Sequence, residues 1–128
     1  MVVDDHDGVR GVICRLLRAQ PDFTVIGEAV NGAEALSKAQ ELQPHVIVLD
    51  ISLPDMDGLT VAAKKIRDVT PSAEILRVSN YNEGEITKAF VAGARRYLLK
   101  SNAGLELVAA IRTVNRKEPY LSVKERDQ

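Results

Sequence analysis

The chain has 128 residues, with 17 Lys and Arg against 18 Asp and Glu and a hydrophobic share of 45%. This length and composition predict one globular domain with its own core and argue against global disorder. The formal net charge of −1 argues against a basic nucleic-acid surface, the single Cys14 excludes a disulfide framework, and the lack of long apolar runs predicts no membrane span.

The first part of the chain alternates short apolar runs with segments of helical period. Residues 1–3 predict a short strand, and residues 23–27 predict a second one. Asn31 is the predicted N-cap of a helix that extends to Leu42. The helix between the two strands is predicted from apolar residues on one face, followed by a proline: Val9, Val12, Ile13, Leu16, Leu17 and Pro21.

The second part of the chain continues this alternation. Residues 46–49 are a continuous aliphatic run, typical of a central parallel strand covered on both faces. Further strands are predicted at residues 75–78 and 97–99. Three helices are predicted from the apolar sets Leu59, Ala62, Ala63, Ile66 and Val69, then Ile86, Ala89 and Phe90 closed by Gly93, and finally Leu107, Ile111 and Val114. Strands alternating with helices in this way predict a mostly parallel α/β sheet with helices on both faces.

In such a sheet, the functional site lies beyond the carboxyl ends of the strands. That edge would carry Asp4 and Asp5, Asp50, Ser79 and Lys100. Three crowded carboxylates need a cation, and oxygen ligands favour Mg²⁺. One carboxylate could then act as a nucleophile while Lys100 and Ser79 contact phosphate oxygens. The residues at this edge therefore predict phosphoryl transfer with Mg²⁺ as the cofactor.

Several motifs also resemble a known family. They are Val2-Val3-Asp4-Asp5-His6, Val48-Leu49-Asp50-Ile51-Ser52-Leu53-Pro54 with Asp57-Gly58, Val78-Ser79, and Gly93-Ala94 leading to Tyr97-Leu98-Leu99-Lys100. Together they resemble a two-component response-regulator receiver domain over nearly the whole chain, and residues 118–122 resemble the receiver end of the NarL/FixJ type. The resemblance implies a flavodoxin-like (CheY-like) doubly wound five-stranded parallel sheet of (βα)5 type. The receiver would span residues 1–118, with a C-terminal tail or the start of a linker at 119–128.

By this resemblance, Asp50 accepts a phosphoryl group from a sensor histidine kinase, and Ser79 and Lys100 hold the phosphoryl oxygens. Tyr97 would be the aromatic switch residue that packs inward when the Ser79 hydroxyl moves toward the phosphoryl group. The chain would be a signalling domain rather than an enzyme, with at most slow autodephosphorylation. Its single Cys14 favours a reducing, cytoplasmic setting. Its output would be transcription through a DNA-binding module outside this sequence, and the family allows a homodimer.

The resemblance also implies the Mg²⁺ ligands. Asp5 would bind the ion directly and Asp4 largely through water. Asp50 and the backbone carbonyl of Ser52 would complete the set. No organic cofactor is implied.

Two departures from the family pattern keep other functions open. The first strand is short, and Arg77 lies inside a predicted strand, where it must reach solvent, find a carboxylate or distort the strand. A degenerate receiver that binds partners without phosphorylation is therefore one alternative. A flavodoxin-like cofactor binder is less favoured, because the acidic residues 4–8 would repel a phosphate in the absence of a metal.

Overall fold

The computed structural model describes residues 1–57, 61–79 and 96–121. The helices are α1 (Asp7–Arg18), α2 (Gly32–Leu42), α3 (Val61–Val69) and α5 (Ala103–Asn115), with a short 3₁₀ helix, η1 (Lys100–Asn102), before α5. The strands are β1 (Val2–Val3), β2 (Glu28–Ala29), β3 (Val46–Asp50), β4 (Glu74–Ser79), β5 (Arg96–Leu99) and β6 (Tyr120–Leu121). All are parallel and form one sheet of order β2-β1-β3-β4-β5-β6.

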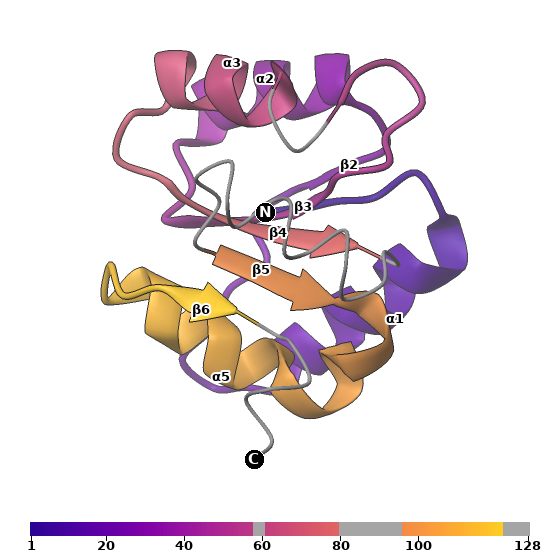
Figure 1. Ribbon diagram of the computed structural model, residues 1–128, viewed down its shortest axis with the longest axis vertical. Helices are drawn as coiled ribbons and strands as arrows, with labels where there is room; N and C mark the ends of the chain where they lie inside the picture. Colours follow the sequence, from indigo (N-terminus) through magenta and orange to yellow (C-terminus); the bar gives the residue numbers. More distant parts are fainter. Residues whose placement is uncertain (58–60, 80–95, 122–128) are drawn as a thin grey trace.

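The sheet lies between two layers of helices (Figure 1). Helices α2 and α3 cover one face, and α1 and α5 cover the other. Along β3, Ile47 and Leu49 pack into the core on the first face, and Val48 packs into the core on the second. The aliphatic run of β3 is therefore buried on both sides, as its sequence predicts for a central strand.

Helix ends follow the sequence closely. The His6 ring accepts a hydrogen bond from the Val9 amide at 3.1 Å at the start of α1. Asn31 accepts one from the Glu34 amide at 2.8 Å, which confirms the predicted N-cap of α2. Helix α2 ends where predicted, because Gln43 adopts a left-handed conformation with φ of 48° and a proline follows.

The strand predicted at residues 23–27 is wrong in position. The observed β2 begins at Glu28, and its two residues pair with Val2 and Val3 of β1. A strand needs a neighbouring backbone, and β1 has only these two residues. In the described part of the chain, residues 23–26 therefore have no β1 backbone beside them, despite their strand-like composition.

The edge beyond β5 carries one strand more than the five predicted. Strand β6 pairs in parallel with β5, through Tyr120 beside Arg96. The helix predicted around Ile86, Ala89 and Phe90 lies outside the described residues. Among the helices that the structure describes, none is long and apolar enough to cross a membrane.

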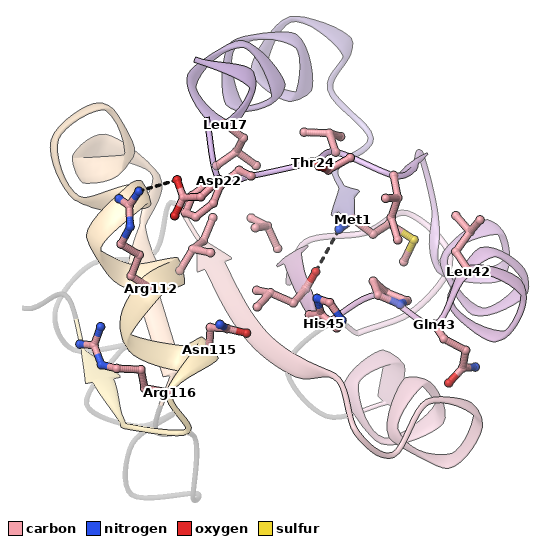
Figure 2. A pocket seen from close by; sticks show the side chains of 17 residues that line it. Met1, Leu17, Asp22, Thr24, Leu42, Gln43, His45, Arg112, Asn115 and Arg116 are labelled. Carbon is pink, nitrogen blue, oxygen red and sulfur yellow. Dashed lines mark hydrogen bonds and ion pairs between the residues drawn. The ribbon is translucent and has the colours of Figure 1, made fainter. Parts of the chain in front are cut away.

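Residues 23–26 line a groove of about 700 Å³ at the amino-terminal ends of β1 and β3 (Figure 2). The groove is therefore at the opposite end of the sheet from Asp4 and Asp50. Leu17 of α1, Leu42 of α2 and Ile111 of α5 contribute to its walls. The amino group of Met1 lies in it and donates a hydrogen bond to the carbonyl oxygen of Val46 at 2.9 Å.

In a polypeptide of these 128 residues, this buried amino group predicts a pH dependence of stability. Burial lowers the pKa of the Met1 amine from 8.0 to about 6. The folded state therefore disfavours the protonated amine, so the penalty is complete below pH 6 and vanishes above pH 8. The two pKa units correspond to about 2 to 3 kcal/mol, so the free energy of unfolding should rise by that amount between those pH values.

The prediction is tested by urea denaturation of the chain and of its Nα-acetylated form across that range. Acetylation removes the titrating group, while the exposed His6 and His45 remain in both forms. The difference in unfolding free energy between the two forms should change with pH. Parallel pH profiles would contradict the prediction.

Candidate functional site

The carboxyl ends of β1, β3 and β5 bring four charged side chains together. Asp4 and Asp5 follow β1, Asp50 is the last residue of β3, and Lys100 follows β5. The Lys100 Nζ lies 3.1 Å from Asp4 Oδ2 and 3.2 Å from Asp50 Oδ2. Residues that are far apart in sequence thus meet at the edge where the parallel-sheet rule predicts a site.

The two buried carboxylates are held in the same way. Asp4 and Asp50 are only 1% and 2% exposed. Asp4 Oδ1 accepts a hydrogen bond from the His6 amide at 2.8 Å, and Asp50 Oδ1 accepts one from the Ser52 amide at 2.9 Å. Each carboxylate therefore has one oxygen fixed by a backbone amide, while the other oxygen faces the Lys100 ammonium.

Burial and charge act in opposite directions on these groups. Burial raises the pKa of Asp50 above its ordinary value, although the Ser52 amide and the Lys100 ammonium favour its ionised form. Burial would lower the pKa of Lys100, but the Asp50 and Asp4 carboxylates outweigh it and leave that pKa raised. The lysine is thus held in its charged form between two carboxylates.

The donor set at this edge fits Mg²⁺. Asp4, Asp5 and Asp50 each offer a carboxylate oxygen, and these atoms lie within 4.8 Å of one another. Three carboxylates carry more negative charge than Lys100 balances, and hard oxygen donors suit a divalent ion. Asp5 is exposed, so the cluster is open to solvent on its side. When bound, the ion would neutralise the remaining charge and attract phosphate oxygens.

Ser79 and Tyr97 lie on neighbouring strands beside this cluster. Ser79 ends β4 next to Leu99, the residue before Lys100, while Tyr97 of β5 lies next to Arg77 of β4. Alternate residues of a strand share a face, so the side chains of Ser79, Arg77 and Tyr97 lie on one side of the sheet. Ser79 and Tyr97 are both fully buried, so the hydroxyl group and the aromatic ring both lie inside the fold.

Arg77 is accommodated without distorting its strand. Strand β4 keeps its register with β3 over five residue pairs, from Val46 beside Glu74 to Asp50 beside Val78. The Arg77 residue is 7% exposed. Burial first and the nearby positive charge of Arg67 second lower its pKa to about 10, although Tyr97 acts in the opposite direction.

The side chains of Arg10 and Asp55 make contacts near the site that were not predicted from the sequence. The Arg10 guanidinium donates to the backbone carbonyl of Asp4 at 2.8 Å, to Asp7 at 2.7 Å and to Glu28 at 3.1 Å, and so ties the loop after β1 to β2. Asp55 contacts the start of α2. The Asp7–Arg10 spacing signals an ion pair within a helix, but the contacts with other elements have no local signal.

Residues 1–112 match the family described as the response regulator receiver domain. The chain belongs to this family. The predicted family is thus confirmed, and so is the CheY-like parallel fold. These are signalling domains, and receiver domains in general bind Mg²⁺, for which the acidic cluster provides the donors.

Two regulators with longer chains are among the curated relatives of this receiver. The transcriptional regulatory protein LiaR of Bacillus subtilis is 36% identical over 124 residues, which cover 97% of this chain and 59% of LiaR. The response regulator VraR of Staphylococcus aureus is 35% identical over 133 residues, which cover the whole chain and 63% of VraR. The receiver thus spans about three fifths of the length of these relatives.

Solved structures show the same fold. A two-component response regulator of the LuxR family from Aurantimonas sp. superposes with a TM-score of 0.84 at 35% identity, covering 95% of this chain and 87% of that one. The response regulator domain of CheB from Thermotoga maritima has a TM-score of 0.77 at 30% identity, covering 92% and 96%. The LuxR/NarL type of the receiver agrees with the NarL/FixJ resemblance of its sequence.

Proposed function

We propose that this receiver accepts a phosphoryl group on Asp50 from a sensor histidine kinase. The observation that supports it best is the Lys100 ammonium, which lies 3.2 Å from Asp50 Oδ2 and 3.1 Å from Asp4 Oδ2. A lysine beside one buried carboxylate would be an ordinary ion pair. A lysine shared with a second carboxylate, next to an exposed third one, is a charge arrangement suited to a phosphoryl group and a divalent ion.

In the proposed reaction, the Asp50 carboxylate attacks phosphorus. The P–N bond to the kinase imidazole breaks as the P–O bond to Asp50 forms. Burial raises the pKa of Asp50 and so makes its carboxylate more basic, while the Ser52 amide holds Oδ1 and orients Oδ2. Lys100 and the Ser79 hydroxyl contact the phosphoryl oxygens, where charge develops during transfer.

The same proposal assigns the metal ligands. Asp5 would bind the ion directly, Asp4 would act largely through water, and Asp50 and the Ser52 carbonyl would complete the set. The support is the close approach of the three carboxylates and the exposure of Asp5. An ion held by these residues would lie beside Asp50 and would balance the negative charge of the transferred phosphoryl group.

Output would depend on a change of conformation. Ser79 makes a contact with the phosphoryl group that the unphosphorylated state lacks. Tyr97 is already buried in this structure, and it would hold the inward position that the movement of the Ser79 hydroxyl stabilises. A ligand shifts a conformational equilibrium only through such differential contacts. Because LiaR is named as a transcriptional regulatory protein, we propose transcription as the output, through a DNA-binding module beyond a receiver of residues 1–118. Residues 119–128 would then lead into the linker, the setting would be cytoplasmic, and a second copy of the chain would be a dimer partner.

The test is incubation with Mg²⁺ and acetyl phosphate, followed by intact-mass measurement and peptide mapping. We expect one phosphoryl group, located on Asp50. Asp50→Asn should lose it, while Asp57→Asn, which changes an exposed carboxylate later in the same loop, should keep it. A wild-type chain that is folded but takes up no phosphoryl group would contradict the proposal and favour a phosphorylation-independent interaction module.

A further inference from the structure

The loop that follows Asp50 is closed on itself. The Ser52 amide donates to Asp50 Oδ1, and Ser52 forms an isolated antiparallel bridge with Asp57. The backbone carbonyl of Asp57 in turn accepts a hydrogen bond from Ala62 of α3 at 2.8 Å. Residues 52–57 therefore form a short loop whose two ends meet next to the proposed phosphoacceptor.

Asp55 connects the tip of this loop to a different helix. Its Oδ1 accepts a hydrogen bond from the Gly32 amide at 2.7 Å, and its Oδ2 accepts one from the Ala33 amide at 2.9 Å. These are the first two residues of α2, whose N-cap Asn31 binds the next amide, that of Glu34. Asp55 thus completes the capping of α2 from outside the helix.

The pKa of Asp55 agrees with this contact. It lies below its ordinary value because of the Gly32 amide first and the Ala33 amide second. Both hydrogen bonds favour the ionised carboxylate.

Met56 makes the loop and the helix approach closely. A Cβ atom at Gly32 would clash with Met56 Cγ, so any other residue at this position would require the Met56 side chain to move. Met56 packs against the core on the side of α2 and α3, and Leu53 is buried in the same core. The loop tip is therefore held by a charged contact at Asp55 and by an apolar contact at the next residue.

We propose that Asp55 is a positioning residue for the metal and phosphoryl site, which it supports by tying the Ser52 loop to the start of α2. This inference rests on the proposed function. The Ser52 peptide has two tasks in that function, because its N–H holds Asp50 Oδ1 and its carbonyl is a proposed metal ligand. Both tasks depend on one loop conformation, and Asp55 fixes the loop at the point farthest from its closed ends.

Loss of the Asp55 contact should therefore weaken metal binding more than it weakens folding. A freed loop populates the binding-competent conformation for only part of the time. The apparent dissociation constant for Mg²⁺ rises as that fraction falls. Residues that orient metal ligands without binding the metal commonly change affinity by about tenfold or more.

The experiment compares Mg²⁺ affinity with stability. Mg²⁺ alone is titrated into the full chain by isothermal titration calorimetry, and urea denaturation without metal is measured on the same proteins. Asp55→Ala should raise the Mg²⁺ dissociation constant about tenfold, and Asp55→Asn should give a smaller rise because one acceptor oxygen remains. Should Asp55→Ala not fold, Asp55→Asn provides the comparison.

Glu34→Gln is the matched control. It removes a carboxylate from the same turn of α2, where Glu34 pairs with Lys38 at 3.0 Å, without touching the loop. It should lower stability slightly and leave the dissociation constant unchanged. Asp55 variants that lose stability but bind Mg²⁺ as tightly as the wild type would overturn the positioning role and leave the proposed metal site intact. A wild-type chain that binds no Mg²⁺ would overturn the metal site and, with it, this inference.

Discussion

Lys100→Met should destabilise the metal-free protein by about 3 kcal/mol, because it leaves two buried carboxylates without their shared cation. Asp4 and Asp50 are almost completely buried, and the oxygens that face Lys100 have it as their cationic partner. Methionine keeps much of the side-chain volume, so the loss reports charge rather than packing. Urea denaturation in the presence of a chelator measures it.

Mg²⁺ and a second substitution provide the controls for this prediction. A divalent ion can replace the missing charge, so Mg²⁺ should stabilise the Lys100→Met variant more than the wild type, in proportion to RT ln(1 + [L]/Kd). Asp50→Asn removes one of the two carboxylates and should restore part of the lost stability in the double variant. A Lys100→Met protein as stable as the wild type without metal would contradict the proposed charge balance.

Arg77→Leu should have the opposite effect and raise the free energy of unfolding by roughly 1 to 3 kcal/mol. Burial lowers the pKa of Arg77 to about 10, which means that the folded state disfavours the charged guanidinium relative to water. Leucine matches its apolar neighbours Ile75 and Leu49 in the core on that side of the sheet. Two groups favour the charged form: Tyr97, which lies beside Arg77 on β5, and Asp57, which is exposed and would stay hydrated after the substitution.

Arg67→Leu is the control variant for Arg77→Leu. Arg67 lies on the exposed side of α3, and its loss should change stability by no more than about 0.5 kcal/mol. Urea denaturation at neutral pH measures both variants. A destabilised Arg77→Leu protein would show that the contacts of the guanidinium outweigh its burial.

The parts of the fold that sequence could predict depend on local patterns. Asn31 caps α2 as its side chain suggests, and the aliphatic run before Asp50 forms the central strand. The site follows from one further rule, since the carboxyl ends of parallel strands share an edge. That rule predicts that Asp4 and Lys100 meet, and their side chains lie 3.1 Å apart.

The remaining features depend on contacts between distant residues. Residues 23–27 have a strand-like sequence, but the length of β1 decides whether they have a partner. Strand β6 forms because Tyr120 reaches the free edge of β5, just beyond the end predicted for the receiver. The Asp55 contact joins a loop to a helix start 22 to 23 residues away in sequence. The helix predicted near Ile86 lies outside the described residues and stays a prediction.

The bridge between Asp4 and Lys100 also has a consequence for the order of folding. Asp4 follows β1 and Lys100 follows β5, the first and the fifth strands along the chain, so the ion pair can form only after nearly all of the domain has been synthesised. Until then, Asp4 and Asp50 repel each other, and a partly assembled sheet pays that electrostatic cost without compensation. Such non-local contacts slow folding and favour an all-or-none transition. Competence for phosphoryl transfer would therefore appear together with the complete fold, and chains interrupted before β5 would lack both.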